Sequence, residues 1–138
     1  MAVSFSLESS LLEPVRRHLY SNGVRKLSNE VQFYDYRLDV YGYSSKTDAT
    51  YAVELKLRKW QRALEQALIY QLCADYVLLA LPATNIASVD VSLLKKYGIG
   101  LIAVQSEKRC VRVLEPRQSP AIYSTYKDFY VKLVQGEK

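Results

Sequence analysis

The chain has 138 residues, the length of one domain that is large enough to bury a hydrophobic core. Its formal net charge is +5 and 49% of its residues are hydrophobic, which fits a globular protein with a mild preference for polyanions. Two cysteines are too few for a disulfide framework or a four-thiolate metal site, and neither a signal peptide nor a membrane-spanning run is recognisable. We therefore predict a single domain over 1–138 that is cytoplasmic (intracellular) and has no membrane partner.

The first half of the chain predicts a helix followed by three strands. Leu11, Val15 and Leu19 recur at helical spacing, and Asn22-Gly23 marks the end of that helix. A polar loop over 44–50 separates two apolar segments and indicates a hairpin. The predicted elements are a helix over 9–20 and strands over 24–33, 36–43 and 51–57.

The second half alternates helical and strand patterns. Two near-continuous apolar runs are typical of strands that are buried on both faces of a mixed or parallel sheet. Together with the hairpin, they predict an α/β sandwich in which helices flank a central mixed β-sheet. The predicted elements are helices over 60–74, 88–97 and 122–134 and strands over 76–81, 99–104 and 109–114, the last at the sheet edge.

The strand over 51–57 carries the chemistry-bearing residues. Side chains alternate along a strand, so Glu54 and Lys56 point to the same face, together with Ala52. Leaving a carboxylate or an ammonium group unpaired in a buried strand is costly. A divalent metal ion would satisfy Glu54, and a phosphate would satisfy Lys56.

The hairpin register predicts a partner for Glu54. If the hairpin is symmetric about Lys46/Thr47, Asp39 faces Glu54 with Cβ atoms about 4.5–5.5 Å apart. Two carboxylates at that distance repel unless a cation lies between them, and oxygen ligands suit Mg²⁺ or Mn²⁺. Lys56 lies on the same face and could orient or deprotonate a water molecule. The alternative is an acid pair beside a lysine on an exposed sheet face.

Asp39 followed by Glu54-x-Lys56 resembles the PD-(D/E)xK nuclease superfamily. The resemblance implies a restriction-endonuclease-like fold, with Asp39 and Glu54 as metal ligands and Lys56 as the catalytic lysine. The Pro that usually precedes the family's first acid is absent, because Leu38 stands at that position.

A second motif lies on the predicted helix that follows. Gln66 and Tyr70 fit the Q-x-x-x-Y motif of the RecB-like and lambda-exonuclease-like branch. The two residues share a helix face, and the resemblance implies that they look toward the active site and the DNA backbone. The alternative is that both are ordinary residues of an amphipathic helix.

The family often adds an acid from the first helix. Glu13 is the first candidate for this further metal ligand and Glu8 the second, while Glu30 in the first strand remains a further acid. Pro14 leaves the local geometry open.

Basic residues surround the predicted site. Arg58, Lys59 and Arg62 lie at the start of a helix, where N–H groups also favour phosphate, so they are candidates for nucleic-acid binding. A solvated basic face is the alternative. Arg37 is a further candidate, beside Asp39, where an ion pair could hold the acid in place.

The resemblance implies a Mg²⁺- or Mn²⁺-dependent deoxyribonuclease of the repair or recombination type. A Holliday-junction resolvase-like endonuclease and a non-catalytic DNA-binding or assembly protein on the same fold are the alternatives. A plain α/β interaction protein, in which Glu54-x-Lys56 is a coincidence, is a third. The sequence leaves open DNA against RNA, endonuclease against exonuclease, and whether the tyrosine-rich last helix (about 121–134) forms a homodimer or packs on the core.

Overall fold

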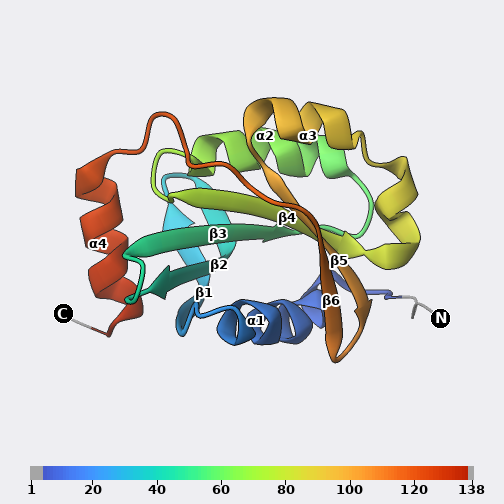
Figure 1. Cartoon of the computed structure of the whole chain (residues 1–138), viewed down its shortest axis with the longest axis horizontal. Helices are drawn as coiled ribbons and strands as arrows, with labels where there is room; N and C mark the ends of the chain where they lie inside the picture. Colours follow the sequence, from blue (N-terminus) through green and yellow to red (C-terminus); the bar gives the residue numbers. More distant parts are fainter. Residues whose placement is uncertain (1–4, 137–138) are drawn as a thin grey trace.

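Six strands form one mixed β-sheet with helices on both faces in the computed structural model, which describes residues 5–136 (Figure 1). The helical elements are η1 (Glu8–Leu11), α1 (Leu12–Ser21), α2 (Trp60–Tyr70), η2 (Ala83–Ser88), α3 (Val91–Tyr97) and α4 (Ser124–Val134). The strands are β1 (Lys26–Phe33), β2 (Tyr36–Ser44), β3 (Ala49–Leu55), β4 (Tyr76–Pro82), β5 (Gly100–Ser106) and β6 (Arg109–Leu114). This arrangement confirms the predicted α/β architecture.

The strands lie in the sheet in the same order as in the sequence. β1, β2 and β3 form an antiparallel meander, β3, β4 and β5 run parallel, and β6 returns antiparallel at the edge. Helix α2 joins β3 to β4, and η2 with α3 joins β4 to β5, because parallel neighbours need a long crossover.

The helices divide the core between the two faces of the sheet. Helix α1 covers one face, where Leu11, Val15 and Leu19 pack on Val40 and Val53. Helices α2, α3 and α4 cover the other face. The second core includes the following buried residues from these three helices: Trp60, Ala63, Leu64, Ala67, Tyr70, Leu94, Tyr130 and Val134.

The predicted hairpin register is confirmed. Val40 pairs with Val53 and Tyr41 with Ala52, so the paired numbers sum to 93 as expected. Strand β3 begins and ends two residues earlier than predicted, at Ala49 and Leu55. Lys56 is therefore the first residue after the strand, although its N–H still donates to the Ala80 carbonyl at 3.0 Å.

The expected alternation along β2 is wrong near Asp39. Leu38 and Tyr41 belong to the core under α2, whereas Val40 belongs to the core under α1. The neighbouring strand is irregular at the same level, because Glu30, which lies between the paired residues Asn29 and Val31, has a left-handed φ of 52°. Such backbone strain in a non-glycine residue often marks a functional site.

Helix α4 is fastened to the start of β3 by a buried acid. Asp75 Oδ2 accepts hydrogen bonds from the Thr50 N–H at 2.8 Å and the Thr50 hydroxyl at 3.0 Å. Lys127 Nζ of α4 lies 2.9 Å from the same oxygen. The Ser119 N–H also donates to the Asp75 carbonyl at 2.7 Å. This cluster joins the C-terminal segment to the strand that carries Glu54.

Candidate active site

Asp39 and Glu54 meet where β2 and β3 separate. The described β2–β3 pairing stops at Val40 and Val53, one residue before these two acids would pair. The Leu55 N–H donates instead to Asp39 Oδ2 at 2.8 Å, which fixes the carboxylate at the end of the ladder. The Asp39 and Glu54 carboxyl groups lie close enough to share a hydrogen bond. The structure therefore brings together the two acids that the register predicted.

Burial favours the protonated form of both acids, and for Glu54 the charge of Asp39 adds to this effect. Glu54 is 4% exposed, and burial followed by the charge of Asp39 raises its pKa from 4.5 to about 8. Burial also raises the pKa of Asp39, although the Leu55 N–H opposes that change. Without a cation, the pair keeps one proton at neutral pH.

Helix α2 places Tyr70 and Gln66 on the same side as Glu54. Tyr70 is fully buried, and its hydroxyl donates to Glu54 Oε1 at 3.3 Å. Burial and the neighbouring Glu54 charge raise the pKa of Tyr70, so the phenol remains a donor. Gln66, one turn earlier on α2, has the one buried side-chain oxygen or nitrogen without a hydrogen-bond partner among residues 5–136. Such an unpaired acceptor calls for a ligand or a water molecule.

Lys56 is half-buried just beyond β3. Its charge lowers the pKa of both Asp39 and Glu54, so the ammonium group lies within electrostatic reach of the pair. The predicted triad of two acids and one lysine thus comes together where β2 and β3 separate. Leu55, whose N–H positions Asp39, has no sequence signal because the contact is made by the main chain.

The first candidate for a third acid lies elsewhere. Glu13 is exposed on α1, and its Oε1 lies 3.9 Å from Arg17 Nε. The structure therefore does not bring Glu13 to the cavity of Asp39, whereas Glu8 of η1 lies there, and a metal-binding role for either acid remains a prediction. Glu8, Glu30 and Asp39 line one cavity of about 290 Å³. The Glu8 charge contributes to the raised pKa of Asp39.

The four predicted basic residues all have exposed side chains. Arg58, Lys59 and Arg62 lie at the start of α2. Arg37 does not pair with Asp39 as expected; its Nη1 lies 3.9 Å from Glu30 Oε1. Binding of nucleic acid by these four residues remains a prediction.

The donor set suits a hard divalent cation. Asp39, Glu54 and Glu8 offer carboxylate oxygens, and a cation would relieve the repulsion between the first two. Within residues 5–136, no group of three His, Cys, Asp or Glu side chains is already arranged to hold a metal ion. Mg²⁺ commonly takes only one or two protein carboxylates and completes its shell with water and substrate phosphate, so the arrangement fits that mode of binding.

The raised pKa of Glu54 predicts an unusual pH dependence of stability. The folded protein binds more protons than the unfolded chain between about pH 4.5 and pH 8, so the free energy of unfolding should fall as pH rises through this window. Mg²⁺ should reverse the fall above pH 7, because it favours the ionised acids. Thermal unfolding in EDTA and in Mg²⁺ across pH 5–9 measures both effects.

Glu54→Gln should remove most of this pH dependence, because an amide does not ionise. Glu65→Gln, which changes an exposed acid of α2, is the matched control and should keep the wild-type slope. A slope that is the same in wild type and Glu54→Gln would show that the Asp39–Glu54 pair does not titrate as described.

Helix α4 packs and also exposes aromatic surface. Tyr130 and Val134 enter the core, while Tyr123, Phe129 and Leu133 remain exposed. Phe33, Tyr34 and Tyr126 line a cavity of about 360 Å³ beside them. The core-packing interpretation of this helix is confirmed, and the homodimer remains a prediction. Across residues 5–136, every helix is too short or too polar to cross a membrane.

Comparison with known proteins gives a likeness of fold. The solved structure of the SPO1766 protein of unknown function from Silicibacter pomeroyi is similar, with a TM-score of 0.75 and 17% sequence identity. The similarity covers 97% of this chain and 87% of that one. No protein-family model and no curated protein matches the chain. The function must therefore be argued from the site.

Proposed function

We propose that this protein hydrolyses phosphodiester bonds of DNA with a divalent cation, on a restriction-endonuclease-like fold of the PD-(D/E)xK superfamily. The observation that carries the proposal is the buried pair of Asp39 and Glu54, with Lys56 in electrostatic reach and Tyr70 bonded to Glu54. Each of these residues belongs to one of the two sequence motifs, so their proximity in space supports the proposal.

Asp39 and Glu54 would hold Mg²⁺ or Mn²⁺, and the Leu55 N–H keeps the first of them in place. When bound, such an ion polarises the phosphate and lowers the pKa of a water molecule. Tyr70 holds the Glu54 carboxyl through its hydroxyl. This donor restrains the side chain in a fixed position without adding a charge.

Lys56 would bind a non-bridging phosphate oxygen or orient the attacking water. Its position directly after β3 gives the side chain more freedom than a strand residue has, while the Ala80 carbonyl fixes its backbone. The Gln66 Oε1 atom, buried without a partner, would accept a hydrogen bond from that water or from the lysine. In this assignment, Gln66 of the Q-x-x-x-Y motif positions the attacking water or Lys56.

Cleavage of labelled DNA by wild type and Lys56→Ala tests the proposal. The substrates are linear duplex, single-stranded and four-way-junction DNA, with RNA of the same sequence, each in Mg²⁺, Mn²⁺ or EDTA. We expect metal-dependent cutting that falls at least about a hundredfold in Lys56→Ala. Lys46→Ala, at an exposed loop position, is the control and should cut as wild type does.

The preferred substrate would then distinguish the branches of the proposal. Preference for the four-way junction would favour a resolvase-like enzyme, and preference for ends would favour an exonuclease. Tight binding of DNA by wild type without cutting in either metal would contradict the enzyme and support the non-catalytic alternative. Neither binding nor cutting would contradict both.

A further inference from the structure

A basic groove lies on the face of the molecule that helix α1 covers. The tip of the β5–β6 hairpin extends beside α1, as the lower part of Figure 1 shows. Lys108 at that tip lines the same cavities as Arg17 of α1, one of about 490 Å³ and one of about 440 Å³. A third cavity, of about 220 Å³, shares Arg17 and Lys108 with them and is also lined by Arg109. Glu13 lines the two larger cavities and Glu107 one of them, so acids lie among the cations. We call these neighbouring cavities the α1 groove and define it by Arg16, Arg17, Tyr20, Lys108 and Arg109.

The charges of the α1 groove are available to a ligand. Lys108 and Arg109 are exposed, and neither has an acidic partner within 4.0 Å among residues 5–136. Arg17 lies 3.9 Å from Glu13, but both side chains are more than half exposed, so that ion pair is weak. The basic groups therefore remain able to bind phosphate.

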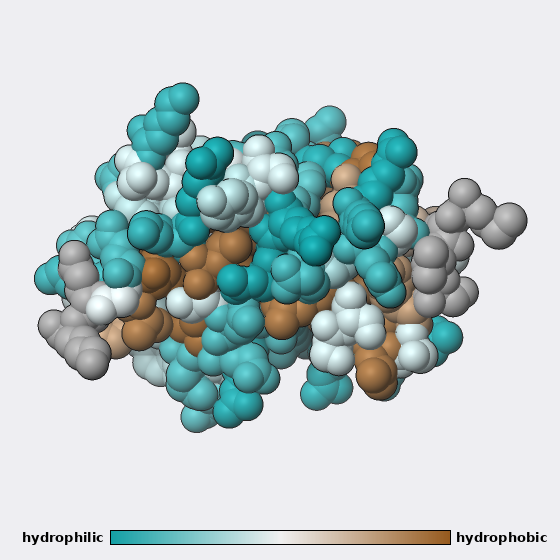
Figure 2. Space-filling view, turned by 90° about the horizontal axis from the view of Figure 1, so that it is seen from below, coloured by the Kyte–Doolittle hydropathy of each residue, from teal (hydrophilic) through white to brown (hydrophobic). Residues whose placement is uncertain are grey.

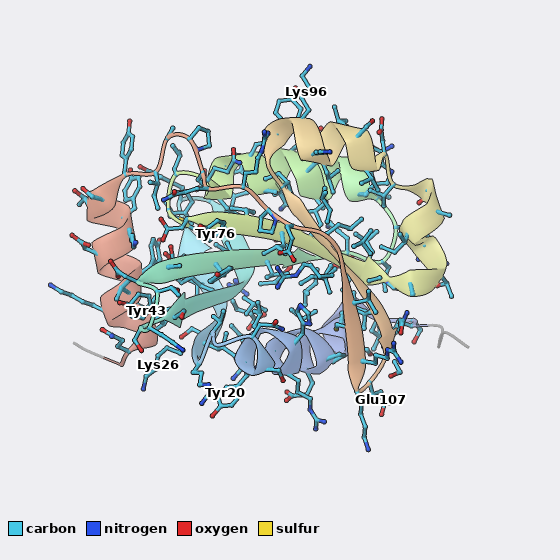
Figure 3. All side chains as sticks on the ribbon, viewed as in Figure 1. Tyr20, Lys26, Tyr43, Tyr76, Lys96 and Glu107 are labelled. Atoms are coloured by element: carbon cyan, nitrogen blue, oxygen red, sulfur yellow. The ribbon has the colours of Figure 1, made fainter. Side chains whose placement is uncertain are left out.

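The groove also carries a flat aromatic surface. Tyr20 is 52% exposed, and the Arg25 guanidinium group stacks over its ring at 5.0 Å. Figure 3 shows Tyr20, Lys26 and Glu107 along this side of the molecule and Lys96 on the opposite side. Figure 2, which views the α1 side directly, shows a mostly hydrophilic surface with smaller apolar patches. Arginine beside an exposed ring suits a nucleic-acid backbone better than an apolar partner.

The α1 groove continues into the candidate active site. Arg16 Nη1 donates to Asn29 Oδ1 at 2.5 Å. Asn29 in turn lines the cavity of about 290 Å³ that also contains Glu8 and Asp39. A strand whose phosphate lies at Asp39 would therefore meet Arg16 next and the rest of the groove beyond it.

We propose that the α1 groove binds the phosphate backbone of the same nucleic-acid molecule that is cleaved at Asp39 and Glu54. The inference rests on the proposed function and adds a second contact surface to it. Helix α1 has 10 residues and is about 15 Å long. Each strand of a duplex has one phosphate per about 3.4 Å of helix axis, so a groove parallel to that axis would span roughly four phosphates of one strand. The contacts are to phosphates and imply no sequence preference.

Binding in EDTA separates this surface from catalysis. Fluorescent duplex and single-stranded DNA are titrated with the full chain as wild type, as Lys108→Ala/Arg109→Ala, and as the matched control Lys95→Ala/Lys96→Ala. The control also removes two adjacent exposed cations, but on the opposite side of the molecule.

We expect the groove variant to raise Kd about tenfold at 0.1 M salt and to lower the salt slope by roughly two. The control should change Kd less than about twofold. Arg17→Ala is a second groove variant and should raise Kd in the same direction.

Three results would overturn the inference. Equal weakening by the groove and control variants would indicate diffuse attraction by net charge. Unchanged Kd in both groove variants would show that the groove is not used. Binding of wild type to phosphatidylserine vesicles but not to DNA would identify the groove as a surface for anionic lipid.

A small substrate distinguishes failure of the groove inference from failure of the proposed cleavage activity. Hydrolysis of bis(4-nitrophenyl) phosphate, which is too small to reach from Asp39 along the groove, is compared in wild type and Glu54→Gln. Metal-dependent hydrolysis that depends on Glu54, together with unchanged Kd in the groove variants, would contradict the groove alone. No hydrolysis, together with weakened binding in the groove variants, would contradict the proposed function while supporting the groove as a nucleic-acid surface.

Discussion

Glu54→Gln should lower the rate of metal-dependent phosphodiester cleavage by about a thousandfold or more. The carboxylate is one of two buried acids that would hold the cation, and an amide of the same shape supplies only a neutral oxygen. The hydrogen bond from Tyr70 can persist, because the amide oxygen also accepts. Single-turnover cleavage at saturating protein measures the effect without interference from weaker DNA binding.

The same substitution should stabilise the protein when no divalent cation is present. Glu54 is buried beside Asp39, and removal of its charge removes both the cost of burial and the repulsion. We expect a gain of about 1–2 kcal/mol at pH 8 in EDTA. Glu65→Gln serves as the control in both experiments. Full cleavage activity in Glu54→Gln would show that Glu54 takes no part in the reaction. Loss of activity together with loss of the folded structure would indicate a structural role only.

Asp75→Ala should lower the free energy of unfolding by about 3 kcal/mol. The substitution leaves the buried Thr50 N–H without its acceptor and removes the partner of Lys127. Asp75→Asn keeps an acceptor for Thr50 but loses the charge, so its loss should be smaller, about 1 kcal/mol. Urea unfolding at pH 7 measures both values, and hydrogen exchange of the α4 amides should show that this helix loosens first.

Asp128→Ala, an exposed acid of α4, is the control and should change stability by less than about 0.5 kcal/mol. If Asp75→Ala cost less than 1 kcal/mol, the cluster would not be what fastens α4 to β3. Cleavage well below the unfolding temperature should survive in Asp75→Ala, because Asp75 contacts the start of β3 while Glu54 lies near its end.

The backbone irregularity of β1 and β2 at Glu30 and Asp39 cannot be predicted from the sequence. Strict alternation along a strand would put Leu38 and Val40 on one face, but these neighbours of Asp39 belong to the two different cores. At the same point of the neighbouring strand Glu30 has a left-handed backbone conformation, and glutamate gives no local signal of such a conformation. The ion pair of Arg37 with Glu30, in place of Asp39, likewise has no sequence signal.

Residues within one strand, hairpin or helix could be placed from the sequence. Glu54 and Lys56 follow the period of a strand, Asp39 is reached through the register of a symmetric hairpin, and Tyr70 and Gln66 share a helix face. These placements depend on local periodicity, which a sequence displays directly. Which of Glu8 and Glu13 lies beside Asp39 depends on where η1 gives way to α1, and such element boundaries are weakly encoded in a sequence.

Only the tertiary structure shows which segments that are distant in the sequence lie side by side. The dipeptides Arg16-Arg17 and Lys108-Arg109 are separated by some ninety residues and carry no shared motif, yet the packing of α1 beside the β5–β6 hairpin brings Arg17 and Lys108 to one groove. Likewise, nothing local indicates that Asp75 will accept from Thr50 and Lys127. The sequence by itself determined the helices and strands, the mixed sheet, and the grouping of Asp39, Glu54 and Lys56, because these follow from short-range periodicity. Long-range packing, which depends on the volumes and charges of the whole core, determined the groove and the α4 attachment.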